Sequence, residues 1–135
     1  MNSPVNVTDT RSETALDRAV LACFTAYEQA LCAGDVPAMD SWFADDVRTV
    51  RFGVAEEQWG AEDIRRWRST APQVPRGRQL SETTVEVWAD SLAVVTTRFR
   101  YPGSVLIGRQ SQTWLLTDAG WRIIHAHVSE RPPAR

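Results

Sequence analysis

The stretch RQLSETTVEVWADSLAVVTTRFRYPGSVLIGRQSQTWLLTDAGWRIIHAHVS, residues 78–129, decides the fold class. β-Branched and aromatic residues recur in it in four segments, which are separated by short runs typical of turns. We therefore predict four strands joined as an antiparallel meander. Their expected ranges are 78–88, 91–101, 105–117 and 120–129.

The sequence before this meander is predicted to be mainly helical. One helical face carries the apolar residues Leu16, Val20, Cys23, Phe24, Tyr27 and Leu31. The pattern TRSE, with Thr10 and Glu13, matches a capping box, so we expect a long helix from there to about Ala33, ended by Gly34. Two shorter helices are expected within residues 36–43 and 59–70, with a strand at 47–52 between them.

Helices that precede a meander favour an α+β fold, with a cone-shaped curved antiparallel sheet packed on the long N-terminal helix plus two short helices. Such a sheet leaves a pocket against the helix, which is the default place for a binding site. We expect a disordered lead-in at residues 1–10, a single domain at 11–131 and a tail at 132–135.

Composition excludes several classes of function. The net charge of -2 over 135 residues predicts no attraction to nucleic acid or to an anionic membrane. No signal peptide and no apolar run of about 18 residues is evident, so a cytoplasmic protein is expected. Cys23 and Cys32 would lie about 13 Å apart along one helix and are interpreted as buried, reduced thiols. All 15 basic residues are arginines, which excludes lysine chemistry and favours guanidinium sites for carboxylates.

Tyr27 and Arg51 are the first candidates for chemistry. Tyr27 is either a core residue or a proton donor at the pocket wall, where a nearby guanidinium would help it to release its proton. Arg51 shares a strand face with Thr49, opposite Val50 and Phe52. It could face solvent, or point inward and bind a carboxylate.

Polar residues on the meander are the next candidates. Gln110 and Gln112 share one strand face, and they either face water or orient a ligand in a polar pocket. Arg98 and Arg100 alternate with aromatic residues on the neighbouring strand, either as a solvated edge or with one side chain in the pocket.

Metal, cofactor and acidic sites are not predicted. His125 and His127 share a strand face, but no third ligand is evident, so we expect them to form hydrogen bonds on that face, at a subunit interface. No nucleotide or nucleophile motif occurs, so no cofactor is expected. Glu56 and Glu57 are expected in a solvated turn, and the absence of any evident inward Asp or Glu disfavours an isomerase of the ketosteroid type.

Four motifs carry a resemblance to a known family: FADDVRTVRFG (43–53), WGAEDIRRWR (59–68), GRQSQTW (108–114) and GWRIIHAHVS (120–129). From Leu16 to Ser129 the chain resembles the AtzH-like family, which includes the oxalurate-catabolism protein HpxZ, within the SnoaL-like, nuclear-transport-factor-2-like superfamily. The resemblance implies a cone fold, a homodimer through the outer sheet face, and action on ureido or carboxylated-urea compounds in nitrogen catabolism. In the family's type member, a dicarboxyurea loses a carboxyl group to leave allophanate.

The resemblance also assigns roles. It implies that Tyr27 and Arg51 are an active-site pair. A looser similarity to the hub domain of calcium/calmodulin-dependent kinase implies that Arg98, Gln110 and Gln112 point inward, while the two histidines point outward.

Together these observations predict a cofactor-free enzyme acting on a carboxylated ureide by decarboxylation or hydrolysis. Arg51, with Arg98, would hold a carboxylate, Gln110 and Gln112 would orient the amides, and Tyr27 would move a proton. The alternative is a non-catalytic module that binds a small carboxylate, or assembles subunits, with the same pocket.

Overall fold

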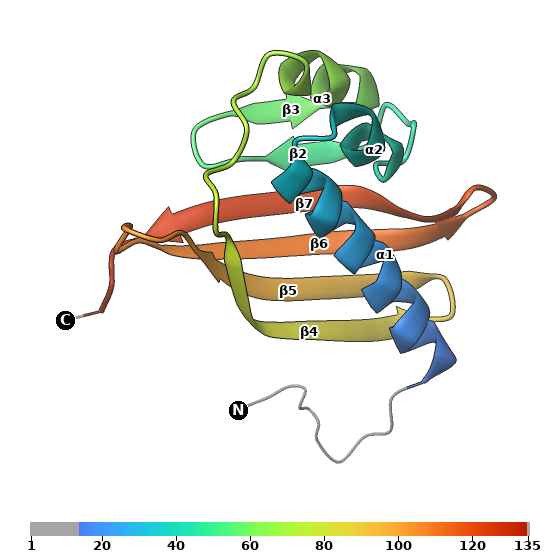
Figure 1. Cartoon of the computed structure of the whole chain (residues 1–135). Coiled ribbons are helices and arrows are strands. Elements are labelled where there is room, and N and C mark those ends of the chain that lie inside the picture. The colour runs from blue at the N-terminus through green and yellow to red at the C-terminus, as the bar shows by residue number, and fades with distance from the viewer. Residues whose placement is uncertain (1–13, 135) are drawn as a thin grey trace.

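The computed structural model describes residues 14–134, in which three helices pack against a curved sheet (Figure 1). The long helix α1 crosses one face of the sheet, and the two short helices lie beside strands β2 and β3 (Figure 1). The helices are α1 (Ala15–Ala33), α2 (Val36–Ser41) and α3 (Ala61–Arg68). The predicted α+β fold is confirmed.

The sheet has six strands in the order β3-β2-β7-β6-β5-β4. Strand β2 runs parallel to β7, and the other neighbouring strands are antiparallel. The predicted meander is present as β4 (Gln79–Ala89), β5 (Leu92–Arg100), β6 (Ile107–Thr117) and β7 (Gly120–Arg131). The shorter strands are β2 (Val50–Phe52) and β3 (Glu57–Trp59), and β3 was not predicted.

The ends of α1 follow from two capping residues. Thr14 and Asp17 form a reciprocal capping box, so the helix begins at Ala15, later than the TRSE pattern suggested. Thr10 and Glu13, which define that pattern, lie outside the described residues. Gly34 ends the helix with a φ of 68°, a left-handed conformation that glycine adopts without strain.

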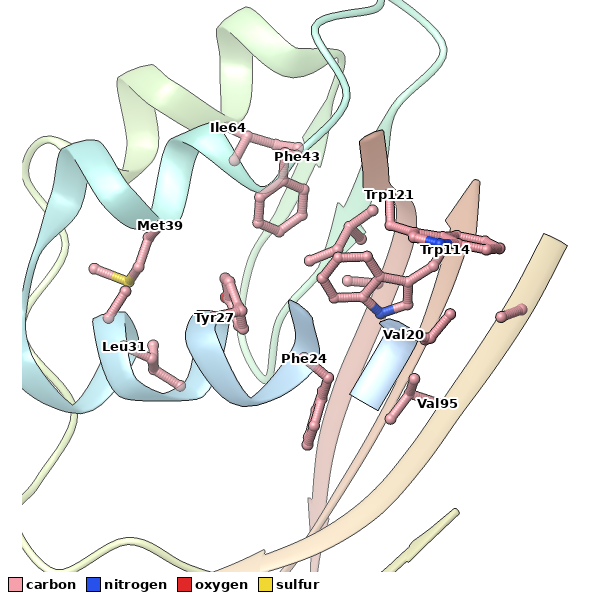
Figure 2. Close-up of a cluster of buried hydrophobic side chains, with 14 residues drawn as sticks. Val20, Phe24, Tyr27, Leu31, Met39, Phe43, Ile64, Val95, Trp114 and Trp121 are labelled. Carbon is pink, nitrogen blue, oxygen red and sulfur yellow. The ribbon is translucent and has the colours of Figure 1, made fainter. Parts of the chain in front are cut away.

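The core lies between α1 and the sheet. Figure 2 shows Val20, Phe24, Tyr27 and Leu31 of α1 gathered with Met39, Phe43, Ile64 and Trp114. These contacts bury the predicted apolar face of α1 and so hold the helix against the sheet.

Cys23 is half-buried and packs on this core, but Cys32 is exposed, so its predicted burial is wrong. In the part of the chain that the structure describes, no helix is long and apolar enough to cross a membrane.

Candidate anion-binding and active site

A cavity of about 160 Å³ lies at the end of α1, enclosed by all three helices, the segment 71–74 and the sheet. Its charged lining residues, among those that the structure describes, are Arg51, Arg68 and Arg78, and no carboxylate lines it. The remaining lining residues are Tyr27, Leu31, Gly34, Val36, Met39, Trp67, Ala71, Pro72, Gln73, Val74, Gln110 and Val128. A small, mostly apolar cavity with converging cations is suited to a small organic anion.

Arg68 places a buried cation beside the Tyr27 hydroxyl. The side chain is on the last turn of α3, and the residue is 6% exposed. Its Nη2 donates a hydrogen bond to the Tyr27 hydroxyl oxygen at 3.2 Å, while its buried Nε has no hydrogen-bond partner in the described part of the chain. Within residues 14–134, no carboxylate forms an ion pair with this guanidinium. The cavity wall therefore carries an uncompensated positive charge.

Tyr27 is held between the core and the cavity. Its ring packs edge-on against Phe43, with 5.8 Å between the ring centroids. The hydrogen bond from Arg68 fixes the phenol oxygen at the cavity wall. The Tyr27 hydroxyl is therefore placed to donate a hydrogen bond to a ligand in the cavity.

Arg51 also lines the cavity, but its guanidinium is already engaged. The side chain is 11% exposed, and Nη1 donates to Glu56 at 2.6 Å and to Gln58 at 2.9 Å. The guanidinium lies over the Trp67 ring, 4.1 Å from its centroid. Burial lowers the pKa of Arg51, and the hydrogen bond that Arg51 donates to Glu56 opposes that shift.

The sequence VRFG explains how Glu56 reaches this arginine. The Gly53 amide donates to the Glu56 carbonyl at 2.7 Å, which closes the turn between β2 and β3. A Cβ at Gly53 would collide with the Glu56 carboxylate, so only glycine lets that side chain fold back onto Arg51.

Arg78 forms the buried end of the site. Its side chain is 3% exposed and contacts both carboxylate oxygens of Glu28, with Nε 2.9 Å from Oε1. It also donates to Gln110 at 3.0 Å and to Tyr101 at 2.9 Å. Burial opposes the charged form of Arg78, but the hydrogen bonds and charge of Glu28 outweigh it and raise the pKa of Arg78.

The structure brings together some predicted site residues and separates others. Tyr27, Arg51 and Gln110 line one cavity, although the guanidinium bonded to Tyr27 belongs to Arg68, not to Arg51. Gln112 is buried behind it, where its Oε1 accepts a hydrogen bond from the Trp114 indole at 3.1 Å.

Arg98 is outside the cavity, so its predicted inward orientation is wrong. Its side chain is 50% exposed and pairs with Glu82 at 3.1 Å on the outer face. The alternation of β5 turns Thr97 and Phe99 inward, which leaves Arg98 and Arg100 in solvent. His125 and His127 are also on the outer face, where both rings contact Phe52 at 5.8 Å between centroids.

The sequence interpretation missed four residues: Arg68, Arg78, Glu28 and Glu56. Helical spacing contained a signal for two of them, because Arg68 follows buried Ile64 by one turn and Glu28 follows buried Phe24 in the same way. Glu28 also overturns the expectation that no carboxylate points inward, although three hydrogen bonds from Arg78 and Gln110 occupy it. No cluster of side chains suited to a metal occurs among residues 14–134.

Comparison with known proteins identifies the family. The AtzH-like family model matches residues 11–133. The chain belongs to the AtzH-like family.

Two solved structures are similar to this AtzH-like chain along most of their length. A cystatin-like fold protein from Burkholderia xenovorans LB400 is 40% identical, with a TM-score of 0.86, and the alignment covers 90% of this chain and 96% of that one.

The second, from Pectobacterium atrosepticum SCRI1043, is described as a protein of unknown function from the DUF3225 family. It is 39% identical, with a TM-score of 0.85, and the alignment covers 88% of this chain and 93% of that one. None of the curated proteins matches this AtzH-like chain.

A more distant structure shows the fold alone. The ketosteroid isomerase-like protein from Erwinia carotovora atroseptica SCRI1043 is 16% identical, with a TM-score of 0.76 over 90% of this chain and 100% of that one. The AtzH-like chain therefore has the fold of the SnoaL-like, nuclear-transport-factor-2-like superfamily.

Proposed function

We propose that this protein binds a small carboxylated ureide in the cavity and promotes its decarboxylation or hydrolysis without a cofactor. The observation that carries the proposal is the Arg68 guanidinium, which is buried, donates to the Tyr27 hydroxyl and forms no ion pair with a carboxylate of residues 14–134. A buried charge without a counter-ion costs stability, and a bound carboxylate would supply that counter-ion. Membership of the AtzH-like family supports the ureide class.

The proposed roles follow the positions of the side chains. Arg68 would hold the carboxylate through its Nε, which has no hydrogen-bond partner among the described residues, and Arg51 and Gln110 would orient the rest of the ligand. In a decarboxylation, the bond between nitrogen and the carboxyl carbon breaks, and its electron pair stays on nitrogen. Tyr27 would give its proton to that nitrogen as carbon dioxide leaves, and would then recover a proton from water.

The direct test of catalysis is Tyr27→Phe, which removes the only hydroxyl that Arg68 contacts in the described residues. With oxalurate and N-carboxylated ureas as substrates, we expect kcat to fall by about 10²-fold or more, the usual size of acid–base assistance. Circular dichroism and thermal unfolding should show that the fold is retained. Full activity of the variant would contradict the mechanism, whereas tight binding without turnover by the wild type would favour the non-catalytic alternative.

We also propose that the protein forms a homodimer through the outer face of the sheet. An aromatic cluster on this face supports the proposal: Trp59, 61% exposed, packs on Phe52, which contacts His125 and His127. Light scattering should give twice the chain mass, and Trp59→Glu should shift that mass toward the monomer. A wild-type monomer at micromolar concentration would contradict it.

A further inference from the structure

We infer that the cavity selects a ligand with a single negative charge, so that the substrate would be a monocarboxylate whose other end is a neutral amide or ureide. This rests on the proposed function, because it names the substrate class of the same site. It concerns the number of charges that the site accepts, which the proposed function leaves open.

The charge of the cavity wall comes from three arginines and their partners. Arg51 is paired with Glu56 at 2.6 Å, and Arg78 is paired with Glu28 at 2.9 Å. Each pair is neutral as a unit. Arg68 forms no ion pair within residues 14–134. The three arginines and the two glutamates that pair with them therefore carry one positive charge together.

The charge of Asp40 also interacts with Arg68, but the Asp40 carboxylate does not contact the guanidinium as an ion pair. No ion pair joins them, and the Asp40 side chain lines a separate hollow together with Arg65, which also acts on it. Its buried Oδ1 has no hydrogen-bond partner. The single uncompensated charge therefore stays on the Arg68 side of the cavity.

A second carboxylate on the ligand would be poorly compensated. It would lose its hydration and find only guanidinium groups that already have carboxylate partners. A neutral amide fits better, because Gln110 has one N–H and one acceptor position left after its bonds to Glu28 and Arg78. The part of the cavity wall formed by Gln110 is thus suited to an uncharged donor and acceptor.

Oxamate and oxalate form a matched pair of probes, since they have nearly the same size and differ by an amide in place of a carboxylate. Isothermal titration calorimetry at pH 7 should show that the wild type binds oxamate about tenfold more tightly than oxalate. This comparison needs no variant, so it does not depend on the folding of any substitution.

Glu56→Gln provides the second arm, because it removes the charge that neutralises Arg51 while keeping an acceptor for its Nη1. The affinity ratio should move at least about tenfold toward oxalate. The control is Glu57→Gln, which removes the same charge from the next residue; Glu57 is exposed and bonds to the Trp59 indole outside the cavity. Its ratio should equal that of the wild type.

The outcomes separate the two proposals. If the wild type binds neither probe nor any ureide, the proposed function fails, and the charge selection fails with it. If oxalate binds as tightly as oxamate, or if Glu56→Gln leaves the ratio unchanged, the charge selection is overturned, while anion binding at Arg68 stands.

Discussion

At the scale of single residues, Arg68 and Arg78 are two buried arginines with opposite relations to their surroundings. Arg78 is matched by the Glu28 carboxylate, whereas Arg68 donates to the Tyr27 hydroxyl, lies over the Trp67 ring and forms no ion pair within residues 14–134. A buried charge without a partner lowers the stability of the fold. A protein can keep such a destabilising charge where it is needed to bind an anion. The two arginines should therefore respond differently to the same substitution.

We predict that Arg68→Met leaves the free energy of unfolding unchanged or raises it by about 1 kcal/mol, because methionine keeps the apolar stem and removes the unmatched charge. Arg78→Met should lower it by about 3–5 kcal/mol, because it leaves Glu28 buried without its partner. Urea unfolding of both variants measures the contrast. A larger loss for Arg68→Met than for Arg78→Met would contradict this description of the site.

Asp40 gives a prediction about pH. Burial raises the pKa of its carboxyl, and the charges of Arg68 and Arg65 oppose the shift. Because the folded pKa lies above the unfolded one, ionising Asp40 costs stability as the pH rises through that interval, and the cost is fully present at pH 7. Asp40→Asn should therefore raise the melting temperature at pH 7. The gain should shrink as the pH falls through the raised pKa of Asp40, and it should be lost by about pH 4. A gain that grows at acidic pH would contradict it.

The separation of Arg98 from Arg68 shows which residue-level features the sequence could predict. Alternation defines the two faces of each strand but does not say which face is buried. The inward orientation of Arg98 was predicted from the looser similarity to a kinase hub domain, and that prediction is wrong. The positions of Arg68 and Glu28 were accessible through helical spacing from buried residues. The pairing of Arg51 with Glu56 was not, because it depends on a turn at Gly53 that places the two side chains together.

At the scale of elements, strand β6 contains a close contact that fixes its packing against β5. Gly108 is opposite Phe99, and the Phe99 ring covers the space that a Cβ would occupy. We predict that Gly108→Ala lowers the free energy of unfolding by about 1–3 kcal/mol through overpacking. Ser111→Ala, on the exposed face of the same strand, should change it by less than about 0.5 kcal/mol. Equal effects in denaturant unfolding would contradict the packing.

The elements that the sequence predicted well are those whose signals are local. The periodic apolar face of α1, the Gly34 cap and the turns of the meander each depend on neighbouring residues. Strand β3 and the parallel pairing of β2 with β7 depend on residues far apart in the chain, and three-residue strands carry no clear alternation. The start of α1 was ambiguous because two capping patterns follow each other, and Thr14 with Asp17 forms the observed one.

At the scale of the whole molecule, the fold brings distant segments to one cavity. Tyr27 comes from α1, Arg51 from β2, Arg68 from α3, and Arg78 from the residue before β4. The meander supplies Gln110 and Val128 to the wall of the cavity. A sequence pattern could predict the cone and its pocket, but the charge balance inside it depends on how these segments meet.

The most direct test of the account is the binding of oxalurate, measured by isothermal titration calorimetry, to the wild type, Arg68→Met and Arg98→Met. Both variants remove one positive charge, from the cavity wall and from the outer sheet face respectively. The account predicts micromolar to millimolar binding by the wild type, a loss of at least about tenfold for Arg68→Met, and no change for Arg98→Met. Unchanged affinity in Arg68→Met, with the fold intact, would contradict it.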